Sequence, residues 1–117
     1  MATASILIVE DDGLLALTLE DMIADLGFAT AFTAHSVDDA LRWLEAGGAA
    51  DAALLDVGLR GETVYPVAEA LAARGVPFAF TTGYGEASDT RCRDRPVLAK
   101  PIRQADLQRA RAALTGR

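Results

Sequence analysis

Near its start the chain carries five mostly apolar residues, 5–9, that run directly into three consecutive acids at positions 10–12. A continuous apolar run of this length is too short for a helix and is typical of a parallel strand that is buried on both faces. A buried strand that ends in acids delivers them to one edge of an interior sheet. Residues 28–33 alternate and can form a second strand, and further short apolar runs follow at residues 52–55, 77–81 and 96–99. This pattern therefore predicts a sheet of five strands.

The intervals between these runs have the apolar spacing and the boundary residues of helices. Residues 14–26 place apolar side chains near helical spacing and end at Gly27, and Ser36 suits the N-cap of a helix that continues to residue 45. Two more helices are predicted at residues 63–74 and 103–114. Because parallel strands need crossover connections, this alternation predicts an α/β fold with a parallel sheet covered on both faces.

The segment between the fourth and fifth strands fits this alternation poorly. Residues 83–95 include Gly83 and Gly85 and have almost no apolar stripe, so we expect at most a short, irregular helix there. No linker, repeat or low-complexity stretch divides the chain. Its 117 residues are enough for a single core, and we therefore expect one domain over residues 1–117.

The composition argues against several classes of protein. The net charge of −6 disfavours nucleic acid as a partner, because a phosphate backbone needs a basic footprint. No apolar run is long enough to span a membrane, and residues 1–5 lack the positive charge of a secretory signal. Cys92 is the only cysteine, so no internal disulfide can form. A reducing cytoplasm is the expected location.

The charges are distributed unevenly along the chain. Residues 1–59 hold one base and eleven acids, whereas residues 60–117 hold ten bases and six acids. One interpretation is plain solvation of a charged surface. The other is a basic patch that meets an acidic partner. That patch would consist of Arg91, Arg93, Arg95, Arg103, Arg109 and Arg111.

Polar residues with complementary chemistry stand where the predicted strands end. They are Glu10, Asp11 and Asp12 after the first strand, Asp56 after the third, Thr82 after the fourth and Lys100 after the fifth. In open α/β sheets, sites form at the carboxyl ends of the strands. Clustered carboxylates repel one another unless a cation compensates them, and oxygen ligands with room for water suit Mg²⁺. The pattern predicts a magnesium site at this edge.

Such a site can carry phosphoryl transfer. A carboxylate held beside the metal can attack a phosphoryl group and form an aspartyl phosphate. The metal and Lys100 would neutralise the transferring oxygens, and Thr82 would donate a hydrogen bond to one of them. Lys100 precedes Pro101, which biases it to an extended conformation and allows a cis peptide bond.

Over essentially its whole length the chain resembles the receiver domain of bacterial two-component response regulators. The resemblance rests on residues 6–12 (ILIVEDD), 53–57 (ALLDV), 80–83 (FTTG) and 98–101 (LAKP). It implies the flavodoxin-like receiver fold, a doubly wound parallel sheet of strand order 2-1-3-4-5. It also implies that Asp56 is the phosphoacceptor and that Mg²⁺ is bound by Asp11, Asp56 and the carbonyl of Gly58, with Glu10 as a further metal-site acid. Thr82 and Lys100 match the switch hydroxyl and the lysine of the motif, and Asp12 is expected beside the site or as a helix cap.

A narrower likeness concerns residues 77–85 (PFAFTTGYG), which are similar to the "FAT GUY" signature of single-domain regulators, with Thr81 where that pattern has Ala. Val97 stands where most receivers carry an aromatic switch residue, so the usual coupling between threonine and aromatic ring cannot operate in its common form. Tyr84 either packs over the phosphoryl site in its place or is only a partly buried loop residue. A shortened fourth helix would also alter the standard output face.

The resemblance implies a protein that takes its phosphoryl group from a histidine kinase or a histidine phosphotransfer protein and signals by protein–protein contact. The sole histidine, His35, lies far from the strand ends in sequence and is expected on the surface or as a cap, so the donor histidine belongs to another protein. The chain is not expected to be an enzyme beyond its own phosphorylation and dephosphorylation.

Other functions remain to be weighed against this one. The chain could drain phosphate from a shared kinase, or it could be a degenerate receiver that only binds proteins, although such a receiver would be expected to lack some of the site residues. A phosphatase with an aspartyl-phosphate intermediate usually needs a second Asp two positions after the nucleophile, and Gly58 stands there. Flavin binding is disfavoured because the first strand ends in acids.

Overall fold

The computed structural model describes residues 3–59, 61–83 and 95–115, and its elements follow one another in the predicted order. The strands are β1 (Ser5–Val9), β2 (Ala29–Ala34), β3 (Ala52–Asp56), β4 (Phe78–Thr82) and β5 (Val97–Ala99). The helices are α1 (Gly13–Asp25), α2 (Val37–Glu45), α3 (Tyr65–Ala73) and α4 (Gln104–Thr115). Every bound lies within two residues of the predicted one. The irregular helix expected between β4 and β5 falls largely on residues 84–94, outside the described residues.

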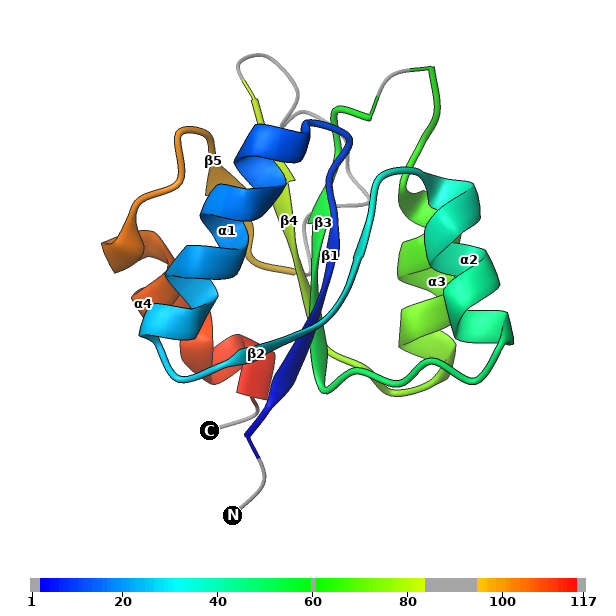
Figure 1. Ribbon diagram of the computed structural model, residues 1–117, viewed down its shortest axis with the longest axis horizontal. Coiled ribbons are helices and arrows are strands. Elements are labelled where there is room, and N and C mark those ends of the chain that lie inside the picture. The colour runs from blue at the N-terminus through cyan, green and yellow to red at the C-terminus, as the bar shows by residue number, and fades with distance from the viewer. Residues whose placement is uncertain (1–2, 60, 84–94, 116–117) are drawn as a thin grey trace.

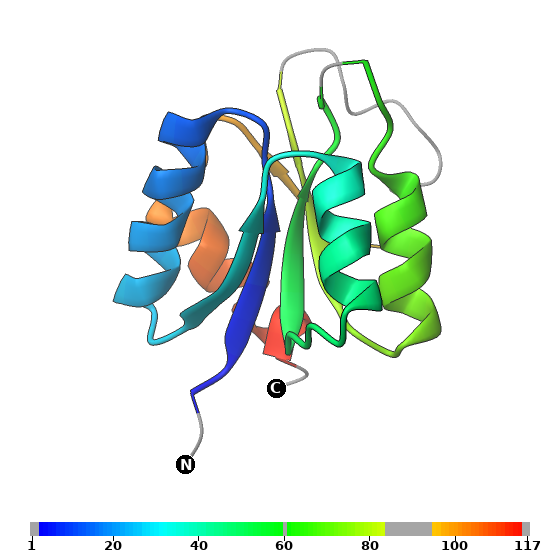
Figure 2. The same ribbon diagram turned by 45° about the vertical axis from the view of Figure 1, so that its right-hand side comes forward.

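The five strands form one parallel sheet in the order β2-β1-β3-β4-β5, which confirms the predicted doubly wound fold. Helices α1 and α4 cover one face of the sheet and α2 and α3 cover the other (Figure 1). Turned by 45°, the same arrangement shows the sheet between the two helical layers (Figure 2). All five strands therefore end at the same edge, which is the upper edge in Figure 1.

Two hydrophobic cores, one on each face of the sheet, explain why strands such as β1 are continuous apolar runs in the sequence. Along β1, Leu7 and Val9 pack into the core under α2 and α3, whereas Ile6 and Ile8 pack into the core under α1 and α4. Side chains alternate between the faces of a strand, so a strand buried on both faces needs apolar residues at every position. The apolar run 5–9 is thus the consequence of two covered faces.

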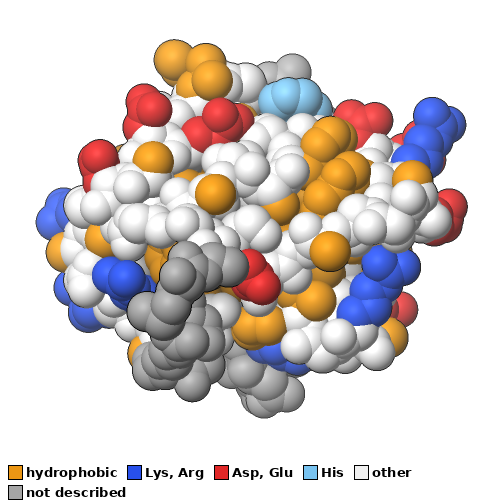
Figure 3. All heavy atoms as spheres, turned by 60° about the horizontal axis from the view of Figure 1, so that its bottom comes forward, with side chains coloured by type: hydrophobic (Ala, Val, Ile, Leu, Met, Phe, Trp, Pro, Cys, Tyr) orange, Lys and Arg blue, Asp and Glu red, His pale blue; other side chains and the backbone are white. Residues whose placement is uncertain are grey.

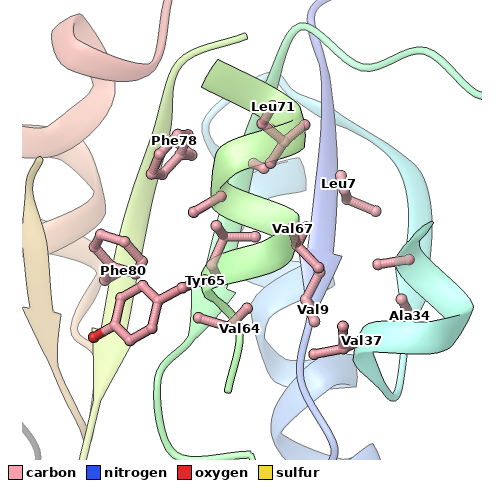
Figure 4. Packing of buried hydrophobic residues seen from close by; sticks show 14 of the residues in the cluster. Leu7, Val9, Ala34, Val37, Val64, Tyr65, Val67, Leu71, Phe78 and Phe80 are labelled. Carbon is pink, nitrogen blue, oxygen red and sulfur yellow. The ribbon is translucent and has the colours of Figure 1, made fainter. Parts of the chain in front are cut away.

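Aromatic rings fix the start of α3 against the sheet. The ring of Phe80 on β4 lies edge-on to Tyr65 at a centroid distance of 5.8 Å and edge-on to Phe78 at 5.5 Å. Figure 4 shows these rings together with Val64, which is fully buried at the end of the loop that precedes α3. Edge-to-face aromatic pairs add stability beyond the area they bury. The start of α3, where the segment after β3 ends, is therefore held in place by buried side chains.

Local signals in the sequence set the helix ends. The side chain of Asp12 accepts hydrogen bonds from the amides of Leu14 (3.0 Å) and Leu15 (3.2 Å), so its expected role as a helix cap is confirmed. The oxygen of Ser36 accepts from the amide of Asp39 at 3.1 Å and caps α2. After α1 the chain turns at Gly27, whose φ of 89° is open to glycine at little cost.

On the face seen in Figure 3, acidic, basic and hydrophobic side chains are interspersed. Of the arginines in the suggested basic patch, Arg91 and Arg93 lie outside the described residues and Arg103 is exposed. The other three make local contacts: Arg109 pairs with Asp106, Arg111 lies over the ring of Phe28, and Arg95 lies 4.2 Å from the ring centroid of Phe78. These contacts favour the interpretation of an ordinary charged surface. The described helices, of which α1 is the longest, fall short of the length and apolar character needed to cross a membrane.

Candidate functional site

The carboxyl ends of four strands bring the predicted site residues to one edge. Asp56 is the last residue of β3 and Thr82 the last of β4, while Glu10 directly follows β1 and Lys100 directly follows β5. Parallel pairing aligns these ends, because β3 and β4 are in register from Ala53 with Phe78 to Asp56 with Thr81. The sheet therefore gathers residues that are far apart in the sequence.

The carboxylate of Asp56 is held by two donors on one of its oxygens. Oδ1 lies 3.0 Å from Nζ of Lys100 and accepts a hydrogen bond from the backbone amide of Gly58 at 2.8 Å. The other oxygen, Oδ2, is buried and has no hydrogen-bond partner among the described residues. The residue as a whole is 1% exposed. One face of the carboxylate is thus fixed and the other oxygen is left for a ligand.

Glu10 is a buried carboxylate in the same cluster. Its Oε2 accepts from the amide of Asp12 at 3.1 Å. Its Oε1 lies 3.1 Å from Nζ of Lys100 but lacks a hydrogen bond of good geometry, so this contact is best described as an ion pair. Burial, together with the neighbouring side chain of Asp56 and its negative charge, raises the pKa of Glu10 to about 7, against the opposing effects of the Asp12 amide and Lys100.

Lys100 is the cation between these two carboxylates, and its side chain is 22% exposed. Burial lowers the pKa of Lys100, but the close contacts with Asp56 and Glu10 and their negative charges outweigh burial, so the pKa is raised above its ordinary value. The ammonium group is therefore held charged at the centre of the site. The peptide bond to Pro101 is cis, one of the two forms that the sequence allowed.

Three carboxylates at this edge have the spacing of a metal site. Glu10, Asp11 and Asp56 can each place one oxygen within 4.8 Å of the others. Asp11 is partly buried, whereas the other two are fully buried. A dication with oxygen ligands suits this group, because it would compensate the clustered negative charge and partner the unsatisfied Oδ2 of Asp56.

The remaining predicted site residues lie beside this cluster. Thr82 is 2% exposed, and its carbonyl accepts a hydrogen bond from the amide of Lys100 at 2.7 Å. Gly58 follows Asp56 by two residues and donates its amide to it. Val97, at the start of β5, is 40% exposed and has no aromatic ring to offer. Tyr84, the suggested substitute, is outside the described residues.

Two contacts at this edge involve residues to which the sequence gave no site role. His35 was expected far from the strand ends, but it directly follows β2, and its Nδ1 lies 3.0 Å from the carbonyl oxygen of Glu10. Its side chain is exposed, as expected. Glu62, in the segment between β3 and α3, accepts a hydrogen bond from the amide of Val37 at 3.0 Å. The position of His35 just beyond a strand end was the available signal; for Glu62 no local pattern existed.

Comparison with known proteins gives matches among solved structures. No family model matches the chain, and no curated protein matches it. The solution structure of SdrG from Sphingomonas melonis Fr1 is 50% identical over 97% of this chain and 98% of its own, with a TM-score of 0.85. The BeF3-activated conformation of SdrG, from Pseudomonas melonis Fr1, is 48% identical over 98% and 99%, with a TM-score of 0.80. A response regulator receiver protein from Burkholderia phymatum is 26% identical over 97% and 96%, with a TM-score of 0.85.

Proposed function

This chain belongs to the receiver-domain family of response regulators, and we propose that residues 1–117 act as a single-domain member that accepts a phosphoryl group on Asp56. The group would come from a phosphohistidine of a histidine kinase or phosphotransfer protein. The phosphorylated chain would then signal by protein–protein contact.

The main support for this proposal is the difference between the two oxygens of the Asp56 carboxylate. Its Oδ1 is engaged by Lys100 and Gly58, whereas its Oδ2 is buried without a hydrogen-bond partner among the described residues. A buried carboxylate oxygen without a partner costs free energy. An aspartate kept only for stability would be expected to use both oxygens. The free lone pairs of Oδ2 therefore support a role in ligand binding or nucleophilic attack.

In the proposed reaction a carboxylate oxygen of Asp56 attacks the phosphorus atom of the donor. A phosphorus–oxygen bond forms, the phosphorus–nitrogen bond breaks, and the imidazole nitrogen keeps the bonding electrons. Lys100, already 3.0 Å from Asp56, would neutralise charge on the transferring oxygens. Thr82 ends the neighbouring strand, and its hydroxyl would donate to a phosphoryl oxygen.

The acidic cluster supports Mg²⁺ as the cofactor. Asp11, Asp56 and the carbonyl of Gly58 would hold the ion, with Glu10 beside them. Bound there, Mg²⁺ supplies charge neutralisation on the phosphoryl oxygens. Burial and, to a smaller extent, the negative charge of Asp56 raise the pKa of Glu10, and a dication bound among these acids would oppose this effect.

The phosphodonor is proposed to lie on another protein. The only histidine of the chain, His35, directs Nδ1 at the carbonyl of Glu10, which can only accept a hydrogen bond. Nδ1 therefore carries the hydrogen atom in this contact.

The proposed reaction is limited to the chain's own aspartate, so the protein acts as a substrate and switch. The likeness to the FAT GUY subgroup stays a prediction, as does cytoplasmic location.

Three alternative functions can be compared with this proposal. A phosphate sink would share the same chemistry and lack a downstream partner. A degenerate receiver is disfavoured because Asp11, Asp56, Thr82 and Lys100 are all present. A phosphatase is disfavoured because Gly58 stands two positions after Asp56 and offers no side chain for proton transfer.

Labelling with a small phosphodonor tests the proposal. The protein incubated with Mg²⁺ and acetyl phosphate should gain the mass of one phosphoryl group, and hydroxylamine, which cleaves acyl phosphates, should remove it. Asp56→Asn should abolish the gain, whereas Asp25→Asn, at an exposed acid at the opposite end of α1, should retain it. Unchanged labelling of Asp56→Asn would show that another residue is the acceptor.

A further inference from the structure

The N-terminus of α2 is joined to the segment that follows Asp56. Oε1 of Glu62 accepts a hydrogen bond from the amide of Val37 at 3.0 Å, across 25 residues of sequence. The first amides of a helix have no partner within the helix, so an external acceptor satisfies one of them. Figures 1 and 2 both show the segment between β3 and α3 beside the start of α2. Glu62 therefore connects a helix of one layer to the loop that leaves the site.

Among the described residues of that loop, those at its start and at its end are fixed by the site and by the core. At its start the amide of Gly58 is bound to Oδ1 of Asp56, and the side chain of Leu59 is buried. At its end Val64 is fully buried. Between these anchors Gly61 is exposed and has a φ of 68°, a conformation that other residues rarely adopt. The contact of Glu62 with α2 restrains this middle part.

The start of α2 is itself tied to the acidic site. The amide of Glu10 donates to the carbonyl of Ala34 at 3.0 Å, and Nδ1 of His35 donates to the carbonyl of Glu10 at 3.0 Å. A continuous path of hydrogen bonds and short chain segments therefore runs from Glu10 through the start of α2 to Glu62. From there it follows the loop back to the Gly58 amide on the Asp56 carboxylate.

We propose that Glu62 is a positioning residue for the acceptor site, which holds the loop so that the peptide groups around Gly58 face Asp56. This inference rests on the proposed function, because the Gly58 carbonyl is one of the proposed Mg²⁺ ligands. Loss of the Glu62 contact releases the loop and weakens the site without removing any ligand.

The hydrogen bond, more than the charge, is what Glu62 contributes. The first turn of α2 already holds Asp38 and Asp39, whose negative charges oppose another carboxylate there. A neutral amide at position 62 keeps an oxygen acceptor for the Val37 amide and avoids this repulsion. Glu62→Gln should therefore behave like the wild type, and Glu62→Ala should not.

A simple role in helix capping predicts something different. Ser36 caps the same helix end through the amide of Asp39, and its side chain makes no hydrogen bond to the described part of the loop. Ser36→Ala should therefore weaken α2 while it leaves Glu62 in place. If Glu62 acts only through the stability of α2, the two alanine variants should have the same effect on the site. If it positions the loop, only Glu62→Ala should affect the Gly58 amide.

The test compares wild type, Glu62→Ala, Glu62→Gln and Ser36→Ala. Amide hydrogen exchange of metal-free protein should show faster exchange at Gly58 and Val37 in Glu62→Ala, while Glu62→Gln and Ser36→Ala keep the wild-type rate at Gly58. Titration with MgCl2 should give about tenfold weaker binding in Glu62→Ala alone, as is usual when a group that orients a ligand is lost.

The outcomes separate this inference from the proposed function. Wild-type exchange at Gly58 in Glu62→Ala, or equal effects of Ser36→Ala, would overturn the positioning role. Wild-type protein that binds no Mg²⁺ and takes no phosphoryl group would overturn the proposed function instead. The exchange rates in metal-free protein would still decide whether Glu62 restrains the loop.

Discussion

Nζ of Lys100 lies 3.0 Å from Oδ1 of Asp56, although β4 separates β3, which ends at Asp56, from β5, which Lys100 follows. The lysine side chain therefore spans the end of β4, where Thr82 is located, and it also reaches Glu10 at 3.1 Å. One ammonium group thus bridges the carboxylates of Glu10 and Asp56, which lie at the ends of β1 and β3, across the end of β4. This bridge organises the site before any ligand binds.

Removal of this cation should destabilise the protein. Lys100→Met keeps an unbranched side chain but leaves the buried carboxylates of Glu10 and Asp56 without their partner. The free energy of unfolding of the metal-free protein should fall by about 2 kcal/mol or more, since a buried charge without its partner is costly. Urea denaturation measures this. Arg103→Met, at an exposed position, is the control and should change stability by no more than about 0.5 kcal/mol. Equal stability of both variants would contradict the bridge's role.

The pKa of Glu10 predicts how stability depends on pH. The ordinary pKa of 4.5 applies to the unfolded chain, and the folded value is about 7. Between these values the folded state keeps a proton that the unfolded state releases, so this contribution is fully present below the lower value and is lost as the pH rises to the higher one. Wild type should therefore lose stability relative to Glu10→Gln between about pH 5 and 7.5. Urea denaturation in EDTA gives the difference; a constant difference would mean that Glu10 has an ordinary pKa.

Magnesium should stabilise the folded chain through the acidic cluster. A ligand that binds only the folded state adds about 2.7 kcal/mol at a concentration of a hundred times its Kd. The Tm should therefore rise with MgCl2 and return to its starting value with EDTA. Asp11→Asn should lose most of this rise, and Asp25→Asn should keep it. A similar rise in both variants, or an equal rise with NaCl of the same ionic strength, would argue against a specific site.

Gly48 is required by the packing of the single tryptophan. A Cβ at this position would overlap the indole ring and the carbonyl of Trp43, whose ring stacks on Phe32 at 5.3 Å. Gly48→Ala should therefore cost about 1–3 kcal/mol, the usual cost of overpacking. Gly13→Ala is the matched control, because a Cβ there meets no atom within 4 Å. Urea denaturation followed by tryptophan fluorescence would compare the two, and an unaffected Gly48→Ala would mean that the ring moves freely.

Much of the fold could be predicted because its causes are local. A strand covered on both faces must be apolar throughout, and the strands at residues 5–9 and 52–55 could therefore be predicted from their apolar sequence. The helix ends followed from Asp12, Ser36 and Gly27, whose preferences act within a few residues. The strand order came from the resemblance to receivers, since periodicity alone does not order strands.

The candidate site was predictable for a related reason. Asp56, Thr82 and Lys100 each follow an apolar strand, and parallel strands end at one edge, so strand position alone placed them together. His35 is exposed, as predicted, but its contact with the site was not foreseen, because it depends on the pairing of β2 with β1, which places the end of β2 beside Glu10. The pairing of two strands, which is a tertiary contact, brought it there.

The sequence by itself determined the alternating elements, the acidic edge and the candidate for the phosphoryl acceptor. Only the tertiary structure decided that one oxygen of Asp56 is held by Lys100 while the other has no hydrogen-bond partner in the described part of the chain, and that Glu62 joins the loop to α2. The physical reason is the range of the forces involved. Burial and capping act on neighbours in the chain, whereas these contacts depend on the paths of loops and on packing between segments that are distant in sequence.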